Sequence, residues 1–147
     1  MLSSASKYAI RSVLFMAEKR ADNKKFGAVE VAGELDLSTH FMAKLLQQLA
    51  RAGVISSVKG PHGGYFLSED NLQQKLCDVI AVFESESVFE GCFLGLPECG
   101  NDHPCPVHEV FSEFRENILY KFKQQTISEL AKEVRENGTY LSLKGLI

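Results

Sequence analysis

Apolar residues in the first third of the chain recur at helical spacing, in three segments separated by polar residues. A first helix is expected over residues 6–20 and a second over residues 28–35, where Val31 and Leu35 share one face. Ser38 is a favourable N-cap for a third helix over residues 39–52, which Gly53 is suited to end. The apolar stripe expected on this third helix consists of Phe41, Leu45, Leu46 and Leu49.

Two β-prone segments follow these helices. Residues 54–58 are rich in β-branched side chains, residues 65–67 are apolar, and the turn between them, residues 59–64, contains three glycines and a proline. Two short strands around such a turn, after three helices, are the arrangement of a winged helix. The expected fold class is therefore mainly α with a small β-wing, in which a winged helix-turn-helix domain is followed by further helices.

The second half of the chain divides into a helix, a loop and two more helices. Apolar spacing predicts a helix over residues 71–84, whereas residues 85–103 lack a helical period and contain several glycines. Pro106 is expected to open a long helix, since proline is favoured at a first helical position. A capping box, residues 126–129, predicts a final helix that ends at residues 137–138. The expected parts are a winged-helix domain with its following helix (1–84), a cysteine-containing sensor loop (85–105), and a dimerisation helix with a C-terminal helix (106–147).

The long helix has more large apolar residues than a solvent-facing helix needs. We expect it to pair with its own copy, which makes the protein a homodimer, and the alternative is that it packs onto its own N-terminal domain. The stripe that supports this pairing consists of Val107, Phe111, Phe114, Ile118 and Phe122, flanked by Val110 and Leu119.

Charge is distributed unevenly between the two halves. The net charge is −3, but residues 1–68 contain nine Lys/Arg and five Asp/Glu, a net +4, and residues 69–147 contain seven and fourteen, a net −7. Only the first half is therefore suited to face phosphates. The chain has no apolar run long enough to span a bilayer, and its first 20 residues read as an amphipathic helix rather than a signal peptide. A cytoplasmic location with reduced thiols and no membrane partner is expected.

Polar residues at the start of the third helix and in the wing are the candidate DNA contacts. The N-terminal end of a recognition helix enters the major groove, where Lys44 can contact guanine or a phosphate. Glycines in the wing permit close approach to the DNA backbone, and Lys59 supplies positive charge. A winged helix that binds protein is the alternative, and His40 alone can be an ordinary exposed residue. The candidate DNA-binding residues are Ser38, Thr39, His40, Lys44, Lys59, Gly60, Pro61, His62, Gly63 and Gly64.

Cys92, Cys99 and Cys105, with His108 three residues later, form a candidate metal site. Clustered thiols in a reducing compartment are more often metal-binding or redox-active than structural. The gaps of six and five residues are wider than those of structural zinc sites, while iron–sulfur spacing is permissive. An iron–sulfur cluster, a zinc ion and a thiol/disulfide switch all remain open from the residues alone. Cys77 lies among apolar residues and is expected to be a buried core thiol.

Three segments of the sequence resemble the Rrf2 family of bacterial regulators. They are Lys-Tyr-Ala-Ile-Arg at residues 7–11, the wing motif at residues 53–65, and the three cysteines that precede a long helix. The resemblance extends over nearly the whole chain. It implies a homodimer with a winged helix-turn-helix, a long helix that crosses its copy, and an iron–sulfur cluster where the cysteines are present.

The resemblance also implies a ligand set. Carried over by position, Cys92, Cys99 and Cys105 are the thiolate ligands, and His108 matches the fourth ligand of the cluster regulators in the family. The first gap between cysteines is one residue longer here than in those regulators. A cluster of the 2Fe–2S type is expected ahead of 4Fe–4S. The implied function is transcriptional regulation in which affinity for a double-stranded DNA operator depends on the cluster.

The sequence contains none of the patterns that would indicate an enzyme. We find no Ser/His/Asp set, no phosphate-binding loop and no paired carboxylates in a pocket-forming context. No small-molecule substrate is therefore expected.

Overall fold

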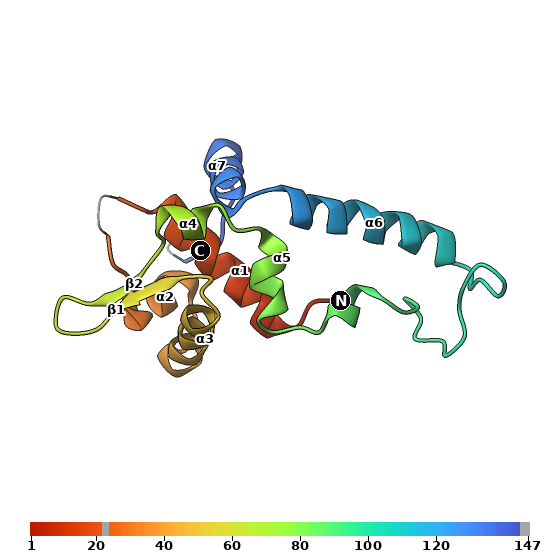
Figure 1. Cartoon of the computed structure of the whole chain (residues 1–147), viewed down its shortest axis with the longest axis horizontal. Helices are drawn as coiled ribbons and strands as arrows, with labels where there is room; N and C mark the ends of the chain where they lie inside the picture. Colours follow the sequence, from red (N-terminus) through yellow and green to blue (C-terminus); the bar gives the residue numbers. More distant parts are fainter. Residues whose placement is uncertain (22–23, 145–147) are drawn as a thin grey trace.

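The computed structural model describes residues 1–21 and 24–144. The chain forms an elongated molecule, with a β-hairpin projecting from one end and a long helix extending toward the other (Figure 1). The elements in chain order are α1 (Ser4–Glu18), α2 (Ala28–Leu35), α3 (Thr39–Arg51), β1 (Ser56–Val58), β2 (Gly64–Phe66), α4 (Glu69–Leu72), α5 (Leu76–Ala81), the 3-10 helix η1 (Glu86–Phe89), α6 (His108–Gln124) and α7 (Ile127–Asn137).

The first three helices contribute most of the buried residues of the main core, and α4, α5 and α7 contribute the rest of its helical residues. The expected bounds of α2 are confirmed, and α3 begins as expected at Ser38, whose Oγ accepts a hydrogen bond from the amide of Phe41 at 3.1 Å. The expected stripe of α3 is wrong at one position. Met42 is fully buried beside the three leucines, whereas Phe41 is half-buried and meets the ring of Tyr8 edge-on.

The wing is the antiparallel hairpin β1–β2, in which Ser57 pairs with Tyr65. The first strand is two residues shorter than expected, because Val54 and Ile55 are buried in the core before the hairpin begins, and the second strand has the expected length but lies one residue earlier. Phe26 extends the sheet by a bridge to Tyr65, with its amide 2.7 Å from the Tyr65 carbonyl oxygen. The mainly helical fold with a small β-wing is therefore confirmed.

The expected continuous helix over residues 71–84 is wrong. The chain forms two short helices, α4 and α5, separated by a turn at residues 73–75. The amide of Lys75 donates to the carboxylate of Asp78 at 2.8 Å, which caps α5, and the carbonyl of Gln74 accepts from the amide of Ile127 at 2.9 Å. The helix is interrupted because its backbone pairs with the distant segment that precedes α7.

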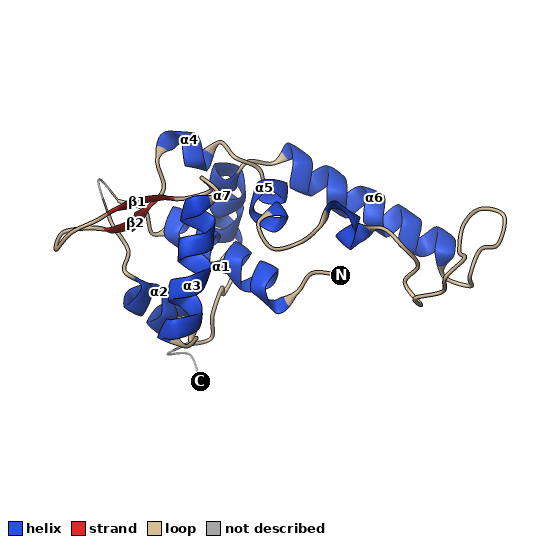
Figure 2. Cartoon of the chain, turned by 60° about the horizontal axis from the view of Figure 1, so that its bottom comes forward, coloured by secondary structure: helices blue, strands red, loops and turns tan. Residues whose placement is uncertain are grey.

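Helix α7 returns to the winged-helix domain and packs against α1 (Figure 2). It begins with the expected capping box, in which Thr126 and Glu129 exchange side-chain and backbone hydrogen bonds, and it ends at Gly138, whose φ of 62° lies in the left-handed region. Ile127, Leu130 and Ala131 are buried. The C-terminal helix is thus part of the same body as the winged-helix domain.

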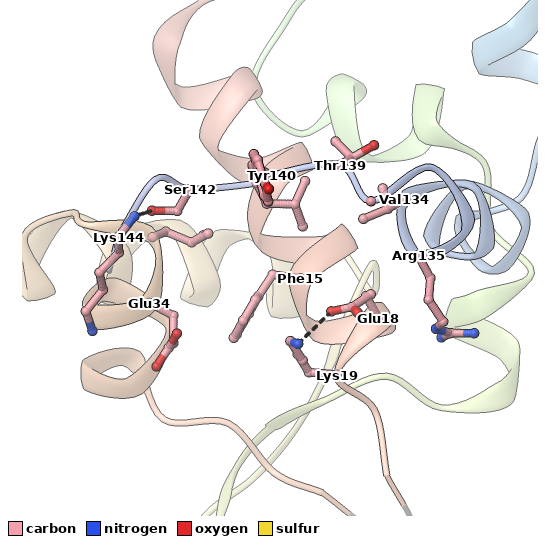
Figure 3. A pocket seen from close by; sticks show the side chains of 13 residues that line it. Phe15, Glu18, Lys19, Glu34, Val134, Arg135, Thr139, Tyr140, Ser142 and Lys144 are labelled. Carbon is pink, nitrogen blue, oxygen red and sulfur yellow. Dashed lines mark hydrogen bonds and ion pairs between the residues drawn. The ribbon is translucent and has the colours of Figure 1, made fainter. Parts of the chain in front are cut away.

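The segment after α7 crosses α1 and closes a cavity of about 290 Å³ beside α2 (Figure 3). The guanidinium of Arg11 donates to the carbonyl of Leu141 at 2.8 Å, which fastens this segment to α1. Phe15 and the Glu18–Lys19 ion pair, whose atoms lie 3.4 Å apart, line the cavity together with Tyr140. The C-terminal segment therefore braces the winged-helix domain.

Helix α6 extends away from the winged-helix domain in both views (Figures 1 and 2). Its 17 residues span roughly 25 Å, and every side chain on it is at least partly exposed. The expected start at Pro106 is wrong: α6 begins at His108, and Cys105 and Pro106 belong to a turn in which the amide of His108 donates to the carbonyl of Cys105 at 3.1 Å. Among the described residues, we find no helix with the length and apolar character needed to cross a membrane.

Candidate functional site

The cysteine loop lies in space at the far end of α6, away from the wing. Its sequence position between the DNA-binding half and the long helix suggests a location between the two, but the chain after η1 runs the length of α6 before it turns back (Figure 1). The loop and the wing occupy opposite ends of the molecule. Any effect of the loop on DNA binding must therefore be transmitted over the length of α6 or through a second copy of the chain.

The structure brings Cys92, Cys99, Cys105 and His108 together. The three Sγ atoms lie within 4.8 Å of one another, and each thiol is half-buried. Two pairs are closer: the sulfurs of Cys92 and Cys105 are 3.7 Å apart, and the sulfur of Cys99 is 3.3 Å from Nδ1 of His108. These four side chains line a cavity of about 80 Å³, together with Gly91, Phe93, Phe111, Ser112 and Arg115.

Backbone amides stabilise one thiolate in this cavity. Hydrogen bonds from the backbone at Leu96 and then Leu94 lower the pKa of Cys92 from 9.0 to about 7, and the Leu94 amide lies 3.3 Å from its sulfur. For Cys99, a backbone hydrogen bond at Cys105 lowers the pKa, but desolvation and the two neighbouring thiols outweigh it and leave the pKa raised. Cys92 therefore ionises more readily than Cys99 near neutral pH, which favours metal binding because the thiolate is the ligand.

The chemistry and spacing of the four donors suit a metal group. Two thiolates on one tetrahedral zinc, with bonds of about 2.3 Å, lie about 3.8 Å apart. The separation of 3.7 Å between Cys92 and Cys105 matches two ligands of one metal atom. The second pair, Cys99 and His108, combines a thiolate with an imidazole, a combination found in both zinc and iron–sulfur sites.

Arg115 is a site residue that the sequence did not indicate. Its side chain lines the cysteine cavity and reaches the backbone just before Cys92. It lies ten residues after Cys105, on the second turn of α6 beyond His108, and only the fold brings it to the loop.

Cys77 lies in α5 and differs from expectation. It is half-buried rather than buried, because it borders the groove between α5, η1 and α6 instead of the main core. Desolvation and the neighbouring carboxylate of Asp78 raise its pKa. It lies outside the group of three cysteines that could hold a metal.

The candidate DNA contacts are exposed on the winged-helix domain. Ser38, Thr39, His40 and Lys44 lie at the start of α3, with their side chains in solvent. In the wing, residues 59–62 are exposed, and Gly63 and Gly64 are half-buried at the base of the turn. A Cβ at Gly63 would collide with the carbonyl of Val58, so the tight turn requires glycine at this position.

Comparison with known proteins identifies relatives over most of the chain. Residues 2–133 match the Rrf2 family model, described as an iron-dependent transcriptional regulator. A protein of Aquifex aeolicus whose name places it among HTH-type transcriptional regulators is 30% identical over 132 residues, which cover 88% of this chain and 90% of that protein. The HTH-type transcriptional regulator IscR of Vibrio campbellii is 27% identical, over 90% of this chain and 77% of its own.

A solved structure has the same fold. CymR, the global cysteine regulator of B. subtilis, superposes with a TM-score of 0.70 at 22% identity, over 90% of this chain and 97% of its own. At this identity the likeness concerns the fold alone.

Proposed function

Because the chain belongs to the Rrf2 family of transcriptional regulators, we propose that its operator affinity is controlled by a metal group held in the cysteine loop. The chain is a DNA-binding regulator and not an enzyme. The observation that carries the proposal is the meeting of three half-buried thiols and an imidazole in one cavity. Thiolate-rich sites of this kind bind iron–sulfur clusters or zinc.

The four donors match in number the ligands that a 2Fe–2S cluster needs. Cys92 with Cys105, and Cys99 with His108, would each hold one metal atom. When bound, such a group supplies a redox-sensitive charge and a set of bonds that reactive small molecules can break. The chain's own contribution is to hold the four donors together and to keep the Cys92 thiol readily ionised, with its pKa at about 7.

Anaerobic purification followed by visible absorption and by assays of iron, sulfide and zinc tests this assignment. We expect a coloured protein with iron and sulfide in equal amounts, at two of each per chain for the 2Fe–2S form. A colourless protein that contains one zinc per chain would identify the site as a structural or sensory zinc site instead of a cluster site. A colourless protein that takes up neither metal after reconstitution would contradict the proposal.

A thiol/disulfide switch is the second candidate, favoured by the Cys92–Cys105 contact of 3.7 Å. The lowered pKa of Cys92 gives it the thiolate character that oxidation requires. Peroxide would take two electrons from the two thiols, release two protons and join the sulfurs, with its own oxygens reduced to water or hydroxide. In the metal-free protein, mass spectrometry after peroxide treatment would then detect a Cys92–Cys105 bond, and operator binding would change with it.

We assign DNA recognition to the start of α3 and to the wing. Ser38, Thr39, His40 and Lys44 are exposed at the end of a helix whose opposite face is buried, as a helix that enters the major groove requires. The wing turn, residues 59–64, places Lys59 in solvent beside glycines that permit close approach to a phosphate.

Replacing Lys59 with alanine tests the wing. A phosphate contact is independent of sequence, so we expect weaker binding to all DNA and a salt dependence that is shallower by about one unit of log–log slope. Fluorescence anisotropy titrations at several salt concentrations measure both quantities. Lys132→Ala, at an exposed position on α7, is the matched control and should change neither. Unchanged affinity and slope for Lys59→Ala would remove the wing from the interface.

We propose that α6 pairs with its copy in a homodimer. Val110 and Phe114 expose 73% and 45% of their surfaces, which is unusual for large apolar side chains on one helix. A groove of about 1020 Å³ between α5, η1 and α6 adds an apolar lining that includes Ile80, Phe89 and Leu119. A second α6 laid across Val110 and Phe114 would cover these two side chains, and a dimer would read two half-sites about one DNA turn apart.

A further inference from the structure

Arg115 ties the cysteine loop to α6 on the side where the loop approaches Cys92. Its Nη1 donates to the carbonyl of Phe89 at 3.3 Å and to that of Gly91 at 3.5 Å. The first carbonyl ends η1, and the second belongs to the residue immediately before Cys92. A single guanidinium therefore fixes the backbone on which the first thiol depends.

An aromatic contact reinforces the same anchorage. The Arg115 guanidinium lies over the ring of Phe111, 5.6 Å from the ring centre. The centre of the same ring lies 5.2 Å from that of Phe93, the residue that follows Cys92. The loop is thus held to α6 on both sides of Cys92, by Arg115 at residues 89 and 91 and by the packing of Phe93 on Phe111. Both side chains also line the cavity that the three cysteines share.

We propose that Arg115 is a positioning residue for the metal site: it clamps residues 89–91 to α6 and so sets the place of Cys92 opposite Cys105. The inference rests on the proposed function, because it assigns the clamp to a metal-binding loop. One guanidinium nitrogen donates to both carbonyls while the flat group lies over the Phe111 ring, and this stacking suits arginine and not lysine. Its positive charge lies beside the cavity that the three cysteines share and would favour the more reduced state of a bound group.

The first test uses the full-length protein without metal, so its result does not depend on which metal or cluster the cysteine loop binds. Loss of two charge-assisted hydrogen bonds should free the loop, and we expect amide hydrogen exchange in residues 89–96 of Arg115→Gln to be roughly tenfold faster. Exchange in α1–α3 and the melting temperature of the winged-helix domain should stay unchanged. Glu116→Gln, at the adjacent exposed position of α6, is the matched control.

The second test uses the protein reconstituted with iron and sulfide. Arg115→Gln should lose iron to a chelator roughly tenfold faster than the wild type and should have a lower reduction potential, because a cation beside the group has been removed. Arg115→Lys should keep the potential near the wild-type value but show the faster exchange and iron loss, since it retains the charge without the flat group that stacks on Phe111. A purely structural role would not separate the two variants in this way.

The two proposals fail in different ways. Equal exchange in residues 89–96 for Arg115→Gln, Glu116→Gln and the wild type, all metal-free, would overturn the clamp whatever the protein binds. Failure of every variant and of the wild type to take up iron or zinc would overturn the metal site, even where the loop of Arg115→Gln exchanges faster.

Discussion

Cys99→Ala is expected to abolish the metal group. Cys99 is the thiol partner of His108, at 3.3 Å, and without it that half of the donor set retains only an imidazole. Iron content after anaerobic reconstitution should fall at least tenfold, with loss of the visible absorption. Removal of a residue that only hydrogen-bonds to a ligand typically lowers metal affinity about 10–100-fold, and removal of the ligand itself should lower it at least as much. Operator affinity should then equal that of the metal-free wild type.

Substitutions at His108 separate its role from that of the cysteines. His108→Cys should retain the group with a shifted spectrum and a lower reduction potential, since a thiolate adds a negative charge where the imidazole was neutral. Cys77→Ala is the matched control: this half-buried cysteine in α5 lies outside the donor group, so iron content should remain at the wild-type level. Wild-type iron content and spectrum in Cys99→Ala would exclude it as a ligand, and the same result in His108→Ala would exclude the imidazole.

Local signals in the sequence were sufficient for most of the winged-helix domain. Ser38 begins α3 and the Thr126 capping box begins α7, because each cap satisfies backbone amides within three residues of itself. The wing follows from its glycines and proline, and the bounds of α2 agree with expectation. These features depend on neighbours in the chain, which is the information that a sequence pattern contains.

Features that depend on distant contacts could not be predicted. The turn that separates α4 from α5 exists because Gln74 accepts a hydrogen bond from Ile127, a residue more than fifty positions later. The return of α7 onto α1 likewise depends on contacts between residues that are far apart in the sequence. Met42 is buried in place of Phe41 because Phe41 packs at the edge of the core against Tyr8 of another helix.

The candidate site was predictable in composition but not in geometry. The four donors follow from their residue types, but the pairing of Cys92 with Cys105 depends on the path of a loop in which Gly91 and Gly95 adopt positive φ. Such a loop has many accessible conformations, and spacing alone does not select one. Arg115 gave no sequence signal, because an arginine on a helix is ordinarily a solvent-exposed charge.

The double substitution Val110→Asp with Phe114→Asp is expected to convert the dimer to a monomer. The two side chains lie four residues apart on α6, outside the main core, with 73% of Val110 and 45% of Phe114 exposed in the single chain, so two carboxylates there should leave the winged-helix domain folded. In a dimer the same carboxylates would be buried against their own copies without partners. Each such substitution at the centre of an interface raises the dissociation constant by roughly 30-fold or more, so the pair should raise it more than 100-fold.

Sedimentation equilibrium at micromolar concentration measures this effect directly. The wild type should show twice the chain mass of 16.3 kDa, and the double variant should show the chain mass itself, with an unchanged helical circular dichroism signal. Glu113→Gln, on the same helix at an exposed polar position, is the matched control and should stay dimeric. Because two recognition helices bind one operator jointly, the monomer should also lose operator affinity while its weak, salt-dependent binding to other DNA persists. If the metal-loaded wild type sediments as a monomer, the proposed dimer contact through the apolar face of α6 is wrong.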